Sequence, residues 1–128
     1  MADGPRFSFT KLLVGDLEAE AAFYSTVLGL AVRHRVAGGE GQRPYEEIIL
    51  GSAGGEEPSL VLLRREVAPQ PGEAVLGFTV GDVDQVVRAA EAAGGVVRSG
   101  PRDMPQAGLR VAQVEDPEGH LVELVQYG

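Results

Sequence analysis

The sequence contains no cysteine. The chain therefore forms no disulfide, offers no thiolate to a metal ion and has no cysteine nucleophile. It also lacks any apolar run close to the roughly 18 residues that a membrane-spanning helix needs. Its first residues lack the basic stretch followed by an apolar stretch that marks a signal peptide. We therefore expect a cytoplasmic protein.

Positive charge is scarce as well. The chain has 11 lysines and arginines against 19 aspartates and glutamates, for a net charge of −8, and Lys11 is its only lysine. Nucleic acids and anionic membranes bind basic surfaces, so neither is an expected partner. The excess of acidic residues either favours a cationic or neutral partner or serves only solubility. The length of 128 residues suits a single domain with its own core.

A short motif occurs twice. Residues 13–17 read Leu-Val-Gly-Asp-Leu, and residues 79–83 read Thr-Val-Gly-Asp-Val, 66 positions later. Each copy ends an apolar strand, and its aspartate, Asp16 or Asp82, is of a type that caps the first turn of a following helix. Apolar residues then recur at helical spacing until a glycine stop signal. The two copies therefore predict two strand–helix units.

Three strand-like runs follow each predicted helix. The segment 100–108 holds two prolines and is expected to be a loop, and a linker is expected at 66–73. The sequence therefore predicts an α+β fold in a single domain over residues 1–128. Two repeated βαβββ modules, at about 6–65 and 74–127, form a curved mixed sheet around a cavity with the helices outside. The predicted runs are 31–36, 45–50 and 59–64 in the first module, and 96–99, 109–114 and 120–127 in the second.

The end of the chain reads as a tight turn followed by a strand. Asp116, Pro117 and Gly119 fit the first, second and fourth positions of a type I turn. The following strand carries apolar residues at consecutive positions, which is typical of burial on both faces. Glu123 interrupts this apolar run. A carboxylate in such surroundings needs a partner or a metal ion, or loses its charge.

These motifs resemble those of the vicinal oxygen chelate superfamily, which includes glyoxalase I, extradiol dioxygenases, fosfomycin-resistance enzymes and bleomycin-resistance proteins. The resemblance covers nearly the whole chain and implies the same doubled βαβββ fold. It does not choose an activity, because one fold serves many functions. Its most specific parts are Val14-Gly15-Asp16-Leu17, Phe23-Tyr24 and Leu28-Gly29-Leu30 in the first module, and Glu115-Asp116-Pro117-Glu118-Gly119 and Val122-Glu123-Leu124 in the second.

The resemblance also implies where a metal ion would bind. Metal-using members place one ligand on the first strand and one on the last strand of each module, and these positions fall on Phe9, Leu62, Val75 and Glu123. Three of these side chains offer only carbon, whereas a divalent ion needs several nitrogen or oxygen donors. We therefore expect no metal site and no cofactor.

The expected site residues follow from strand position and from the resemblance. Glu123 shares a strand face with Leu121 and Val125. It either anchors a ligand at the floor of the cavity or is satisfied by a nearby arginine or backbone donor. Phe9 either stacks on a ligand or fills the core. Lys11, on the same face as Phe9, pairs with an acidic ligand or with Glu123, or lies at the solvated rim. The expected ligand-binding set is Phe9, Lys11, Tyr45, Leu60, Leu62, Val75, Met104 and Glu123.

The two histidines are weaker candidates. His34 lies on a predicted strand, where it is either a general base facing the cavity or a half-exposed residue without a role. His120 follows Gly119 in the turn and is expected at the surface. No serine–histidine–aspartate arrangement is indicated, and no residue is assigned a catalytic role.

Three functions fit these observations. The favoured hypothesis is a metal-free small-molecule binding protein of the bleomycin-resistance type, which sequesters a drug and pairs as a homodimer, as the resemblance implies. The second is a metal-dependent lyase, isomerase or dioxygenase of the same superfamily. The third is a metal-free enzyme that uses Glu123 as acid or base. Whether the chain is an enzyme stays open at this stage.

Overall fold

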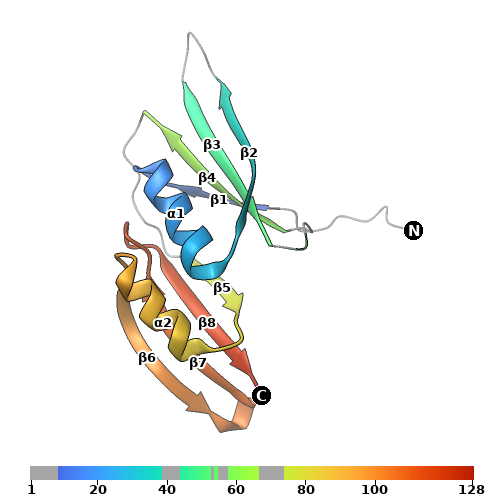
Figure 1. Cartoon of the computed structure of the whole chain (residues 1–128), viewed down its shortest axis with the longest axis vertical. Coiled ribbons are helices and arrows are strands. Elements are labelled where there is room, and N and C mark those ends of the chain that lie inside the picture. The colour runs from blue at the N-terminus through green and yellow to red at the C-terminus, as the bar shows by residue number, and fades with distance from the viewer. Residues whose placement is uncertain (1–8, 39–43, 53, 55–57, 67–73) are drawn as a thin grey trace, which may run out of the picture. The chain divides into compact units, whose positions relative to one another are not determined.

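A computed structural model describes residues 9–38, 44–52, 54, 58–66 and 74–128 (Figure 1). The predicted linker at 66–73 lies almost wholly outside these residues. The chain divides into two compact units, one made of residues 1–25 and 29–69 and the other of residues 26–28 and 70–128. Each unit contains one four-stranded mixed sheet in a βαβββ order, which confirms the predicted α+β fold of two repeated modules.

In the first module, a strand leads into a helix whose first turn is capped by a side chain. Asp16 accepts a hydrogen bond from the backbone N–H of Ala19 at 3.1 Å, and Gly29 ends the helix in the left-handed conformation, with φ of 71°. The sheet order is β1-β4-β3-β2, with β1 parallel to β4 and the other pairs antiparallel. The elements are β1 (Phe9–Leu13), α1 (Leu17–Leu28), β2 (Ala31–Gly38), β3 (Tyr45–Gly51) and β4 (Ser59–Arg65).

The second module repeats this arrangement. Asp82 caps its helix by accepting a hydrogen bond from the backbone N–H of Gln85 at 3.1 Å. The sheet order is β5-β8-β7-β6, with β5 parallel to β8. The elements are β5 (Val75–Thr79), α2 (Val83–Ala92), β6 (Val96–Met104), the 3-10 turn η1 (Pro105–Ala107), β7 (Leu109–Glu115) and β8 (Leu121–Tyr127).

The prediction of a loop at 100–108 is wrong for residues 100–104, which belong to a strand. Strand β6 continues to Met104 through Pro101, with irregular register between Val97 and Ser99 and again between Ser99 and Arg102. A proline lacks the N–H that a central strand needs, but β6 lies at the edge of its sheet, where proline and bulges are tolerated.

Polar contacts identify the face of the second sheet that packs on α2. Arg110 on β7 donates to the Asp84 carboxylate on α2 from Nε and Nη2, at 2.8 and 2.9 Å, and these hydrogen bonds lower the pKa of Asp84. The side-chain oxygen of Gln126 on β8 accepts from the backbone N–H of Val83 at 2.8 Å. Because side chains alternate along a strand, the residues in register with Arg110 and Gln126 face α2 as well. They are Ala112, Val114, Val122 and Leu124, each at most 1% exposed.

The first sheet also buries one face. The pairing of β4 with β1 and β3 shows which side chains share this face. The opposite face carries Lys11 on β1 and Glu47 on β3. The buried set is Leu12, Ile48, Leu50, Leu60 and Leu62.

No helix in the described part of the chain is long and apolar enough to cross a membrane.

The register of β8 predicts unequal costs for two matched truncations. Leu124 is fully buried against α2, whereas Leu121 lies on the other face and is only half-buried. We expect Leu124→Ala to lower the free energy of unfolding by about 2–5 kcal/mol, the range for a buried leucine, and Leu121→Ala to cost less than half as much. Urea denaturation of both variants measures this. Equal losses, or a larger loss for Leu121→Ala, would mean that the faces are assigned the wrong way round.

Candidate functional site

Glu123 lies in the middle of β8, on the face of the second sheet that points away from α2. Its direct neighbour on β7 is Gln113, whose side-chain amide donates a hydrogen bond to Glu123 Oε1 at 3.0 Å. Within the described residues, Oε2 makes no hydrogen bond. The partner that this carboxylate needs is therefore a neutral amide, and one of its two oxygens is left for another donor.

The surroundings of Glu123 on this face are apolar and partly open. On β5 its direct neighbour is Gly77, where an added Cβ would meet no atom within 4 Å. On β8 its flanking residues on the same face, Leu121 and Val125, are half-buried rather than fully buried as the apolar run suggested. The hydrogen-bonded side chains of Glu123 and Gln113 thus lie among apolar side chains, next to the open space at Gly77.

Two further predicted residues share this face. Val75 begins β5, two positions before Gly77, and is 52% exposed. Met104 ends β6 opposite Leu109, which puts it on the same face, and it is also exposed. Their role in binding a ligand stays a proposal.

In the first module, Phe9 and Lys11 lie on one face of β1, and Lys11 has a partner that was not considered from the sequence. Its Nζ lies 2.8 Å from Oε2 of Glu47 on β3 and 6.0 Å from the centre of the Phe9 ring. The Glu47 side chain is only 10% exposed, although a charged residue on a strand is ordinarily solvated. Tyr45, on the same face of β3, is half-exposed and lines a shallow pocket of about 300 Å³ with Arg65.

The equivalence of Leu62 with Glu123 is wrong by one residue. Phe9 pairs with Ser59 on β4, and Val75 pairs with Leu121 on β8, so the residue equivalent to Glu123 is Val61. A shift of one residue moves a side chain to the other face of the sheet. Leu60 and Leu62 accordingly lie in the buried set, on the face opposite Phe9 and Lys11.

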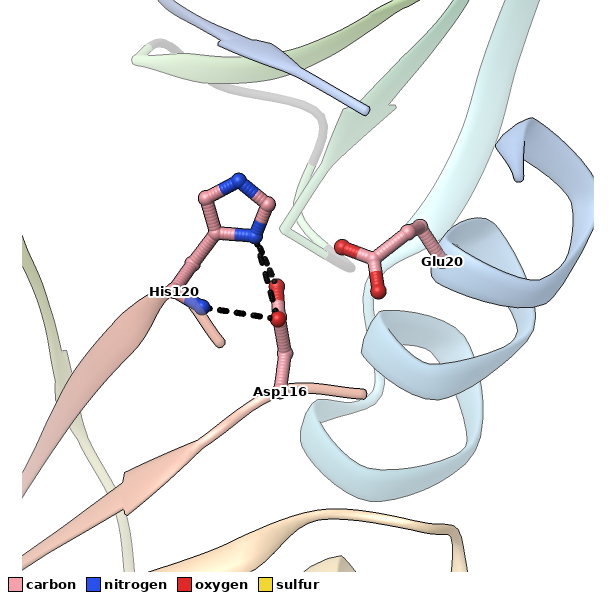
Figure 2. A group of neighbouring side chains, drawn as sticks. All are labelled: Glu20, Asp116 and His120. Carbon is pink, nitrogen blue, oxygen red and sulfur yellow. Dashed lines mark hydrogen bonds and ion pairs between the residues drawn. The ribbon is translucent and has the colours of Figure 1, made fainter. Parts of the chain in front are cut away.

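The expected surface position of His120 is also wrong, because the turn folds over a buried aspartate (Figure 2). The Asp116 carboxylate accepts hydrogen bonds from the backbone N–H groups of Glu118 and His120, at 2.9 and 3.0 Å. His120 Nδ1 also lies 2.8 Å from Asp116 Oδ2. The backbone N–H of Gly119 donates to the Asp116 carbonyl at 2.9 Å, as the predicted turn requires.

Sequence reasoning also missed Glu20, a fully buried carboxylate in the middle of α1 (Figure 2). The helical spacing contained the signal. Glu20 comes three positions after Leu17 and four before Tyr24, both of which are buried, so it lies within the apolar stripe of the helix.

Comparison with known proteins identifies the family. A family model described as the Glyoxalase/Bleomycin resistance protein/Dioxygenase superfamily matches residues 6–124. The chain belongs to this superfamily. A curated "Probable lactoylglutathione lyase" of Vibrio cholerae is 29% identical over 126 residues, covering 94% of this chain and 90% of the relative. The lactoylglutathione lyase of Arabidopsis thaliana is 28% identical over 131 residues, but the chain spans only 46% of that protein.

Solved structures agree on the superfamily fold. A glyoxalase I variant from Zea mays superposes with a TM-score of 0.79 at 25% identity, over 93% of this chain and 46% of that one. TnmS3, an antibiotic-binding protein from Streptomyces, superposes with a TM-score of 0.76 at 24% identity, over the full length of both chains. Proteins that share this fold thus include some named as enzymes and one named for antibiotic binding.

The superfamily's metal positions do not fit a metal ion in this chain. In the first module they carry Phe9 and, by the corrected register, Val61; in the second they carry Val75 and Glu123. Only Glu123 offers a donor atom, and one carboxylate does not replace the several ligands that a divalent ion requires.

The turn at Asp116 yields a stability prediction. Asp116→Ala removes an acceptor from the buried backbone N–H of His120, from the partly buried N–H of Glu118 and from the His120 ring. We expect a loss of about 2–4 kcal/mol in the free energy of unfolding. Asp116→Asn keeps one acceptor oxygen and should lose less. Urea denaturation at pH 7 measures both. A loss below about 1 kcal/mol for Asp116→Ala would show that these hydrogen bonds do not hold the turn.

Proposed function

We propose that this chain is a lyase or isomerase of the glyoxalase superfamily that acts on a small organic molecule, with Glu123 as its acid–base group. The observation that carries the proposal is the Glu123 carboxylate on the face away from α2, held at Oε1 by Gln113. The relatives named as lactoylglutathione lyases support the reaction class.

The local geometry suits proton transfer. A general base needs an oxygen within hydrogen-bonding reach of the proton that it removes. The amide of Gln113 orients the carboxylate and leaves Oε2 to take a proton from the substrate and return it to a different atom. The half-buried Leu121 and Val125 beside it would contact the apolar parts of the substrate and exclude water. None of these steps requires an ion at the superfamily's metal positions.

A second candidate function is metal-free binding without turnover, as in drug sequestration. It is favoured by the exposed apolar side chains of Phe9 and Val75 at two of the superfamily's metal-ligand positions. The similarity of fold to an antibiotic-binding protein is consistent with it. For either function we propose a homodimer, whose mass in solution is measurable by light scattering.

Turnover by Glu123 variants tests the first proposal. The wild-type chain is incubated with lactoylglutathione, other glutathione conjugates and aromatic metabolites, and consumption is followed by mass spectrometry. For a compound that is consumed, Glu123→Gln should lower kcat by about 100-fold or more, because it keeps the shape of the side chain but cannot take up a proton.

The matched control is Glu91→Gln, which removes a carboxylate from the exposed face of α2 and should leave kcat unchanged. Full activity of Glu123→Gln would exclude Glu123 as the acid–base group. Tight binding of a compound that is never consumed would favour the binding function instead.

A further inference from the structure

The open face of the first sheet carries an ion pair with an unequal distribution of exposure. Lys11 on β1 and Glu47 on β3 face each other across β4, with Nζ and Oε2 2.8 Å apart. The Lys11 side chain is 45% exposed, whereas that of Glu47 is 10% exposed. The fold therefore buries the negative end of the pair and turns its positive end toward solvent.

The arrangement gives Lys11 a defined position. A buried carboxylate is costly unless it is paired, so Glu47 holds the ammonium group in place. An ammonium group has three N–H donors, and in the described part of the chain only Glu47 accepts a hydrogen bond from it. Donors therefore remain on the exposed side of Lys11.

An aromatic surface lies next to this ammonium group. The Phe9 ring, two residues before Lys11 on the same face of β1, is 52% exposed, and its centre is 6.0 Å from Nζ. On β4, Val61 lies beside Lys11 and Leu63 lies beside Glu47 on this face; both are apolar, and Val61 is buried. The face thus offers, side by side, one fixed cation, one exposed ring and an apolar floor.

We propose that this face binds an aromatic molecule that carries an anionic group, with the anion on the Lys11 ammonium and the ring on Phe9. An anion receives charge-assisted hydrogen bonds from Lys11, and a ring gains stacking with Phe9. The net charge of −8 opposes non-specific binding of anions, so an anion preference requires a local group of this kind. The proposal concerns the first module alone and is read by binding, so it stands or falls separately from the catalytic role of Glu123.

Paired probes that differ only in charge test the proposal. Naphthalene-2-carboxylate and its neutral analogue naphthalene-2-carboxamide are titrated into the full ¹⁵N-labelled chain, and the amide shifts of β1 and β4 report the site. We expect the carboxylate to bind about tenfold more tightly than the carboxamide in the wild-type chain, the equivalent of one charge-assisted hydrogen bond. Lys11→Met should reduce this ratio to about one, and Lys11→Arg should keep it.

Three variants separate the proposed contacts from general effects. Phe9→Ala should weaken both probes by the same factor, because both use the ring. Glu47→Gln removes the buried negative charge and should raise the carboxylate preference above that of the wild-type chain. Arg64→Met removes a positive charge from the opposite face of the same sheet and should leave the ratio unchanged.

Because Lys11→Met leaves Glu47 without its ammonium partner, the double variant Lys11→Met, Glu47→Gln is measured beside it and should also give a ratio of about one. The proposal is overturned if the wild-type chain binds both probes equally. It is also overturned if the preference survives in the double variant, or if neither probe shifts the amides of β1 and β4.

Discussion

The strict alternation of side chains along β8 is the constraint on which the account of this protein depends. Arg110 on β7 and Gln126 on β8 bind groups of α2, which assigns one face of the second sheet to the helix. Every second residue from Gln126 then faces α2, and Glu123 necessarily falls on the other face. The same alternation keeps the carboxylate off the face that packs on α2 and places it beside Gln113 and Gly77.

The same alternation in the first sheet shows that the two modules carry different side chains on equivalent faces. Phe9 and Lys11 share a face with Val61, where the second module has Val75, Gly77 and Glu123. The carboxylate of the first module is instead on β3, at Glu47, where it is used to hold Lys11. One fold unit thus presents a carboxylate held by an amide, and the other presents an ammonium group held by a carboxylate.

Much of the fold could be predicted because local chemistry marks it. The repeated Val-Gly-Asp motif predicted both helix caps. Gly29 predicted the end of α1, and the turn at Asp116 predicted the start of the last strand. The sequence could not predict which β4 side chains face which side of the sheet. Leu60, Val61, Leu62 and Leu63 are all apolar, so no polar residue marks the exposed side. The burial of His120 was missed because a turn is normally solvated, and only the three-dimensional path of the turn puts its ring against Asp116. Glu47 was missed because its partner lies 36 residues away on another strand.

The absence of cysteine in the natural sequence allows a direct measurement of the central claim. Single cysteines introduced at each position from Leu121 to Val125 are allowed to react with a thiol reagent in the folded protein. The account predicts that positions 121, 123 and 125 react quickly, while positions 122 and 124 react only as fast as the protein unfolds, because those side chains are buried against α2. Fast reaction at 122 and 124 with protection at 123 would contradict it, because Glu123 would then face the core.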